Sequence, residues 1–170
     1  MLKLPREPRI EEKRAEIEKI FASGLVLWKD GNLRVPFVES SECLDKALSF
    51  ARRCGQLRGG LENIETLLQK EQAGLVALKH TQFQGERASR LLLLSNDGSE
   101  RFYRNCESLL IRYRNRILGC KINLTGASFG QKFFGKDAVV KVVMVSKKDF
   151  VGRVLIALAE SGNEQRHFEE

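Results

Sequence analysis

The sequence has few of the residues on which enzymes and metalloproteins usually depend. It contains two histidines, His80 and His167, and four cysteines that form no C-x-x-C pair, so the spacings of zinc knuckles and zinc ribbons are absent. Carboxylates such as Glu62 and Glu65 have a spacing typical of the first turns of a helix, where the helix dipole favours them, rather than of an acid–base pair. We therefore expect no enzymatic activity, no metal and no cofactor.

Long hydrophobic runs are missing as well. The longest, residues 91–94 and 142–145, have the length of strands, whereas a membrane-spanning helix needs about 18 apolar residues. The first residues carry no apolar segment of the kind found in secretory signals. We expect no membrane partner and a cytoplasmic location, in which the cysteines remain reduced and for the most part buried: Cys43, Cys54, Cys106 and Cys120.

The chain does have enough length for one hydrophobic core, and it carries an excess of basic charge. Its 170 residues are typical of a single domain with a short extension. Lysine and arginine number 29 against 22 aspartates and glutamates, which gives a formal net charge of +7. Such a charge favours a nucleic acid, an anionic lipid or an acidic protein as the partner.

Apolar periodicity predicts an alternation of helices and strands. Helices are predicted for residues 9–21, 41–53, 61–70, 102–113 and 148–159, with Ser40 or Ser41 as the N-cap of the second. Strands are predicted for residues 25–28 and 33–37, as a hairpin, and for residues 91–94, 117–122 and 139–145. The helix after Gly60 either continues beyond Lys70 or gives way to a strand at residues 75–78. Residues 79–90 have the polar pattern of an exposed insertion.

This order of elements predicts the fold class. From Ser41 onward it packs most economically as a three-layer α/β/α sandwich with a mixed central sheet, preceded by a helix and β-hairpin extension. We expect the extension to comprise residues 1–41, the sandwich domain residues 42–161, and a polar tail residues 162–170. A loop containing Gly126, Gly130 and Gly135 is expected before the last strand, with glycines that permit positive φ.

Basic residues gather at three places. Arg52, Arg53 and Arg58 flank the start of the helix after Gly60, and Lys132 and Lys136 lie in the glycine loop. A third group falls between Arg101 and Lys121, opposite an apolar stripe. Basic side chains beside helix ends suit contacts with nucleic acid phosphates, which position a nucleic acid without reading its sequence. For the group between Arg101 and Arg116, a solvated helix face is an equally good interpretation.

Five segments carry patterns that occur together, in this order, in one protein family. They are residues 47–57, with Ala51-Arg52-Arg53; 60–68, a glycine followed by a helix; 92–100, with Ser95-Asn96-Asp97; 129–136, with two spaced glycines; and 139–158. They resemble the L-seven-Ae superfamily of kink-turn-binding ribosomal proteins, especially its small bacterial members. The resemblance covers about 110 residues and leaves residues 1–41 uncovered.

The resemblance implies an α/β/α sandwich that binds structured, kink-turn-like RNA, with ribosomal RNA and ribosomal proteins as partners. It places the contact at the helix start near Gly60, the turn at Asp97 and the glycine loop. The implied RNA-binding residues are Arg53, Arg58, Gly59, Gly60, Glu62, Asn63, Thr66, Asp97, Gly130, Lys132, Gly135 and Lys136.

The helix start departs from the family pattern in two ways. Kink-turn binders typically have Asn-Glu followed by a lysine, whereas this chain has Glu62-Asn63 and Thr66. Asn63 retains a donor and an acceptor for a base edge, Glu62 retains an acceptor for a guanine amino group, and Arg58 offers the missing charge.

Two further functions remain open. The fold is shared with the substrate-binding domain of RNA ribose methyltransferases, although 170 residues leave no room for their catalytic domain. It is also shared with superfamily members that bind proteins, so the third possibility is a protein-interaction module.

Overall fold

A five-stranded mixed sheet forms the centre of the molecule. The computed structural model describes residues 2–78, 87–135 and 137–169. The strand order is β3-β6-β5-β7-β4, in which β3, β6 and β5 are parallel, whereas β7 is antiparallel to both β5 and β4. The strands are β3 (Phe37–Val38), β4 (Leu57–Gly59), β5 (Arg90–Leu94), β6 (Ile117–Ile122) and β7 (Val142–Val145).

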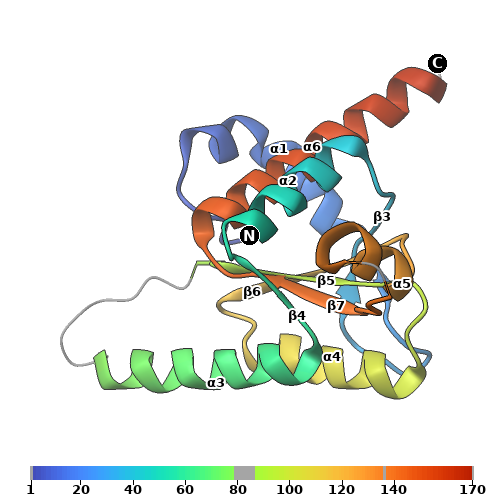
Figure 1. The fold of residues 1–170 in the computed structure, drawn as a ribbon. Helices are drawn as coiled ribbons and strands as arrows, with labels where there is room; N and C mark the ends of the chain where they lie inside the picture. Colours follow the sequence, from blue (N-terminus) through green and yellow to red (C-terminus); the bar gives the residue numbers. More distant parts are fainter. Residues whose placement is uncertain (1, 79–86, 136, 170) are drawn as a thin grey trace.

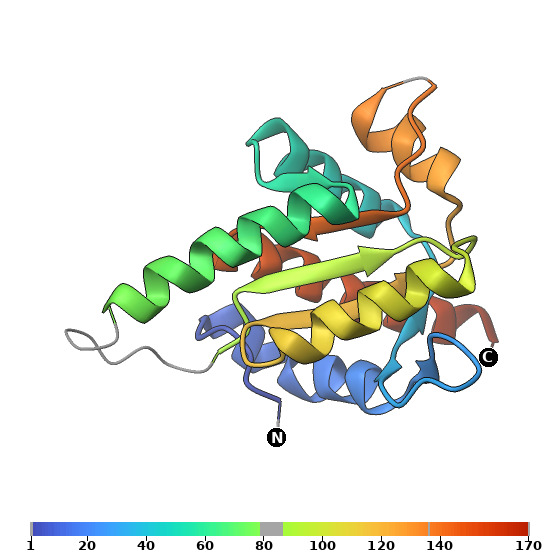
Figure 2. The same ribbon diagram turned by 90° about the horizontal axis from the view of Figure 1, so that it is seen from below.

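Helices cover both faces of this sheet, so the predicted three-layer α/β/α sandwich is confirmed (Figure 1). One face carries α1 (Pro8–Ala22), α2 (Glu42–Arg53) and α6 (Lys148–Glu169). The other carries α3 (Leu61–Leu78) and α4 (Glu100–Arg112), which lie side by side in Figure 2. In β5, Leu91 and Leu93 face the first layer, and Leu92 and Leu94 face the second. A strand covered on both sides must be apolar at every position, which explains this run of leucines.

Two serines fix the starts of the strongest amphipathic helices. The hydroxyl of Ser41 accepts the N–H of Leu44 at 3.1 Å, and that of Ser99 accepts the N–H of Phe102 at 3.1 Å. Each bond satisfies a backbone donor that the first turn of a helix leaves open. After α2 the chain turns at Gly55, whose φ of +71° is the left-handed conformation that commonly ends a helix.

The N-terminal region is packed into the sandwich and has no core of its own. Leu4, Ile10 and Ile17 are buried in the same cluster as α2 and α6. A short hairpin of β1 (Leu25–Val26) and β2 (Arg34–Val35) follows, as predicted, and β3 then joins the main sheet as an edge strand. Residues 2–41 thus complete the first helical layer and one edge of the sheet, and their hairpin buries Leu27 and Val35 in the core of the second layer.

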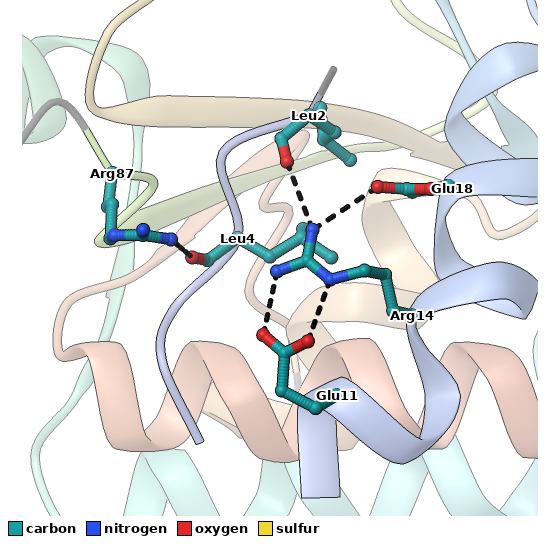
Figure 3. Close-up of polar contacts among 6 residues, drawn as sticks. All are labelled: Leu2, Leu4, Glu11, Arg14, Glu18 and Arg87. Carbon is teal, nitrogen blue, oxygen red and sulfur yellow. Dashed lines mark hydrogen bonds and ion pairs between the residues drawn. The ribbon is translucent and has the colours of Figure 1, made fainter. Parts of the chain in front are cut away.

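Arginines tie the start of the chain to the rest of the molecule (Figure 3). Arg14 donates to the carboxylate of Glu11 at 2.8 Å, to that of Glu18 at 3.2 Å and to the carbonyl of Leu2 at 3.5 Å. Arg87, which precedes β5, donates to the carbonyl of Leu4 at 3.0 Å. The hydrogen bonds that the Arg14 guanidinium donates therefore hold the first residues against α1.

Of the two alternatives after Lys70, the structure has the longer helix: α3 continues to Leu78, so no strand forms at residues 75–78. Other predicted boundaries are wrong. The helix α6 continues to Glu169, past the predicted end at residue 159 and through the expected polar tail. The last strand begins at Val142, because the N–H of Val140 bonds instead to the carbonyl of Gly126 at 2.9 Å. The strand β4 was not predicted. Of the expected insertion at 79–90, residues 79–86 lie outside the described residues.

The four cysteines, all within the described residues, form no disulfide. Cys106 and Cys120 are buried, as predicted, and burial raises the pKa of Cys106 to about 12 and that of Cys120 further. Cys54 is exposed, so the prediction of buried thiols is wrong at this position. Within the described part of the chain, no helix has the length and apolar character needed to cross a bilayer.

Candidate nucleic-acid interface

Three segments that the sequence analysis assigned to RNA meet at one end of the sheet. Because β7 is antiparallel to its neighbours, its start lies between the ends of β4 and β5. The N–H of Gly60, between β4 and α3, donates to the carbonyl of Val142 at 3.0 Å. The N–H of Ser95, after β5, donates to the carbonyl of Lys141 at 2.8 Å. The β4–α3 junction, the turn before α4 and the segment leading into β7 are therefore neighbours (Figures 1 and 2).

The β4–α3 junction (residues 58–63) is built on two glycines with different requirements. Gly60 has a φ of +91°, which L side chains rarely adopt. A Cβ atom at Gly59 would lie 3.0 Å from Val140 and 3.1 Å from the ring of Phe134, so the junction packs tightly on the segment before β7. The amide of Asn63 donates to the carbonyl of Gly59 at 3.3 Å. These contacts fix the first turn of α3 against its neighbour.

The polar side chains of this first turn point to solvent. Glu62, Asn63 and Thr66 are exposed. The Thr66 hydroxyl donates to the carbonyl of Glu62 at 3.0 Å, so it occupies the place of the family's lysine without supplying a charge. Among the described residues nothing pairs with the Glu62 carboxylate. The turn thus offers hydrogen-bond acceptors, and the positive charge needed to bind a phosphate must come from other residues.

The expected glycine loop is largely helical, which corrects the prediction. It consists of α5 (Gly126–Phe129) followed by a π-helical turn, η1 (Gly130–Phe134). Of its three glycines only Gly135 has a positive φ, at +109°. Gly130 is required by close packing, because a Cβ atom there would overlap the carbonyl oxygen of Ala138. Since Gly130 is buried, its role is to let the segment fold back rather than to offer a surface.

The π-helical turn η1 is attached to α2 by two contacts. Lys132 forms an ion pair with Asp45, with 2.8 Å between Nζ and Oδ2. Arg52 donates from Nε to the carbonyl of Phe133 at 3.0 Å, and its guanidinium lies 4.8 Å from the ring centroid of Phe134. Arg52 was not among the predicted site residues, although it belongs to the Arg52-Arg53 pair that the sequence singled out. Lys136 lies outside the described residues.

Asp97 connects the turn before α4 to the start of α5. Its carboxylate accepts the N–H of Gly126 at 3.0 Å, and the Lys141 ammonium donates to its backbone carbonyl at 3.4 Å. Partial burial raises the pKa of Asp97, but the hydrogen bond from Gly126 and the charge of Lys141 outweigh it and hold the pKa below its ordinary value. The carboxylate is therefore engaged inside the protein, although Asp97 itself is exposed.

Two arginines near the junction, Arg58 and Arg53, have exposed guanidinium groups that form no ion pair with another described residue. Arg58 is exposed on the edge strand β4, and no ion pair joins it to another described residue. Arg53 is exposed at the end of α2, where its guanidinium lies 5.8 Å from the ring centroid of Phe50. Both side chains leave their N–H donors available to an anion, in contrast to Lys132, which is already paired.

The basic residues around α4 are mostly paired with carboxylates. Arg104 bonds to Glu100 at 3.1 Å, Arg112 to Glu65 at 3.2 Å, and Arg116 to Glu71. Arg101 and Arg114 remain exposed. These pairs favour the interpretation of this group as a solvated helix face. Within the described residues no cluster of three or more histidines, cysteines and carboxylates is placed to hold a metal.

The fold and the site define a class, a three-layer α/β/α sandwich with polar groups gathered at one end of its sheet. No family model matches the sequence, and no curated protein matches it. A solved structure described as a protein with unknown function from Bacillus halodurans C matches with a TM-score of 0.46 and 21% identity. That match covers 71% of this chain and 99% of that chain.

Proposed function

We propose that the protein binds structured RNA, without catalysing a reaction, through the β4–α3 junction and the helical segment beside it. The proposal extends the resemblance to the L-seven-Ae superfamily, with ribosomal or other kink-turn-like RNA as partner and the cytoplasm as location. The observation that carries it is the packing of Gly59 on η1, where a Cβ atom at Gly59 would lie 3.1 Å from the ring of Phe134, because this contact joins two of the predicted RNA-contact segments, the helix start near Gly60 and the glycine loop. A third, the turn at Asp97, joins them through Gly126.

The junction has the chemistry for both parts of RNA recognition. Gly60 directly precedes α3, and a Cβ atom there would meet only the Asn63 amide, at 3.6 Å, so an RNA backbone can approach the N–H groups of the first turn of this helix. The Glu62 carboxylate and the free oxygen of the Asn63 amide accept hydrogen bonds from base edges, whereas Arg58 binds a phosphate. The carboxylate favours a guanine, because guanine presents an amino donor in the minor groove.

Arg58 supplies the test of this assignment. Arg58→Gln removes one phosphate contact, so it weakens binding of a kink-turn RNA and lowers the slope of log K against log salt by about 0.9. Arg114→Gln is the matched control, because it removes an exposed guanidinium beyond the C-terminal end of α4, at the opposite end of this helix from the Asp97 turn. Fluorescence titrations at several salt concentrations measure both quantities. Equal behaviour of the two variants would overturn the assignment of this site.

A further inference from the structure

A second group of cations lies where α2 and α6 pack together, and of its members only Arg53 was among the predicted RNA-binding residues. The two helices are antiparallel, since Phe50 meets Phe150 at one end and Ser41 meets Ser161 at the other. The rings of Phe50 and Phe150 are 5.6 Å apart. The guanidinium groups of Arg53 and Arg153 lie 5.8 Å and 4.8 Å from the ring centroid of Phe50. These four residues are named the α2–α6 cluster here.

The stacking in this cluster leaves the hydrogen-bonding edges of both guanidinium groups open. A guanidinium that rests its face on an aromatic ring keeps its N–H donors in plane and free for an anion. Arg53 and Arg153 are exposed, and neither forms an ion pair with a residue that the structure describes. The ring of Phe50 therefore orders two cations in advance, which reduces the entropy that anion binding must overcome.

The surroundings of the cluster are also cationic. Lys147 and Lys148 are exposed at the start of α6, and the acidic groups near them among the described residues are the exposed Asp149 and the Glu7 carboxylate, which lies against Gly152. Phe50 lies outside both hydrophobic core clusters and is only partly buried. Neither the core nor a neighbouring carboxylate accounts for this arrangement, whereas an external polyanion does.

The edge strand β4 connects the cluster to the proposed RNA site. The chain passes from Arg53 through a three-residue turn into β4 and reaches Gly60 directly afterwards. Three strand residues extend about 10 Å, and Arg58 lies exposed between the two sites. In Figure 1 β4 is the strand at the front edge of the sheet, and it runs from the end of α2 to the start of α3. A backbone that leaves the junction can therefore follow Arg58 to the cluster.

We infer that the α2–α6 cluster binds the phosphates of a single-stranded RNA segment that flanks the structured RNA held at the β4–α3 junction. This inference rests on the proposed function. It adds a second contact, and its ligand is a single-stranded segment because aromatic rings next to cationic side chains, as in Phe50 and Phe150 with Arg53 and Arg153, are the combination with which proteins bind single strands.

The test compares one kink-turn RNA with and without a single-stranded extension. The unaltered protein binds the extended RNA more tightly and with a steeper salt slope. Arg153→Gln abolishes this gain, lowers the salt slope for the extended RNA by about 0.7, and leaves binding of the unextended RNA unchanged. Arg114→Gln, which removes one exposed guanidinium beyond the C-terminal end of α4 in the opposite layer, preserves the gain.

A second measurement locates the contact directly. Photo-crosslinking from 4-thiouridine in the extension is expected to label the peptides that contain Phe50 or Phe150. Absence of a gain, or equal loss in Arg153→Gln and Arg114→Gln, overturns the inference while leaving binding at the junction intact. If polyglutamate competes for the cluster as strongly as the single-stranded RNA does, the cluster would be assigned to an acidic protein partner instead. Failure of the unaltered protein to bind either RNA would overturn the proposed function together with this inference.

Discussion

The carboxylate of Asp97 accepts a hydrogen bond from the backbone N–H of Gly126 at 3.0 Å. The two residues are 29 positions apart, and the bond ties the turn before α4 to the first residue of α5. Gly126 in turn accepts the N–H of Val140 at 2.9 Å, at the point where the chain returns toward β7. Asp97 therefore organises the segment beside the RNA site from inside the protein.

This bond predicts a pH-dependent loss of stability in Asp97→Ala. The pKa of Asp97 is lower in the folded protein than in the unfolded chain, so its contribution is present above the unfolded value and is lost as the pH falls through the folded value. At pH 7 we expect the variant to lose about 0.5–1.5 kcal/mol in free energy of unfolding, as is typical of one hydrogen bond. Urea titrations at pH 7 and below the folded pKa measure the difference, which should shrink in acid; a constant difference would contradict this account.

The overlap at Gly130 predicts a large effect of a single methyl group. In Gly130→Ala the new Cβ meets the carbonyl of Ala138, so η1 or the following segment must move. We expect a loss of about 1–3 kcal/mol in free energy of unfolding, measured by chemical denaturation. Gly74→Ala is the control, because nothing lies within 4 Å of a Cβ at this position of α3. It should gain up to about 1 kcal/mol from helix propensity, and equal stability of the two variants would refute the packing argument.

The ion pair between Lys132 and Asp45 predicts a variant that binds RNA more tightly. Asp45→Asn releases the Lys132 ammonium, which is 39% exposed and lies next to the proposed site. We expect a higher affinity and a salt slope steeper by up to about 0.9, the effect of one added phosphate contact. Glu42→Gln removes the same charge from the same turn of α2 without touching Lys132, so it separates this effect from a general change in charge. Identical affinities would show that Lys132 makes no RNA contact.

The exposure of the cysteines predicts their order of reaction with a thiol reagent. Cys54 is exposed and should react first in the native protein, and Cys54→Ser should remove that fast phase. Cys106 and Cys120 should react only on unfolding, because burial raises the pKa of both thiols and blocks access. Absorbance with Ellman's reagent, with and without denaturant, follows the reaction. Fast modification of a third thiol in the native state would contradict the core packing.

Much of the fold follows from local sequence signals. The apolar stripes located α2 and α4, a cap at Ser40 or Ser41 marked the start of α2, and the run of leucines located β5. The strand β4 carries no such signal, because three residues that include a glycine are too short to show alternation. It forms because β7 offers an unpaired edge, which is a tertiary property.

Only those parts of the site that are formed by residues close together in the sequence were predicted. The glycines at 59 and 60 and the polar turn that follows were recognisable as a helix start. The contact of Arg52 with Phe133 joins residues 81 positions apart, and Phe50 and Arg153 are 103 positions apart, so neither contact leaves a pattern in any short window. The π-helical turn was missed because it depends on the close approach of Ala138 to Gly130.

The central claim, that this fold binds kink-turn-like RNA at the β4–α3 junction, is tested most directly by one titration. The unaltered protein is titrated at several salt concentrations against a kink-turn RNA, the same RNA without its sheared G·A pairs, and an unstructured RNA. The account predicts the tightest binding to the intact kink-turn, with Glu62 and Asn63 preserving recognition although their order is inverted. Equal, steeply salt-dependent binding to all three would contradict recognition at the junction, and no binding to any of them would contradict an RNA-binding function and favour a protein-interaction module.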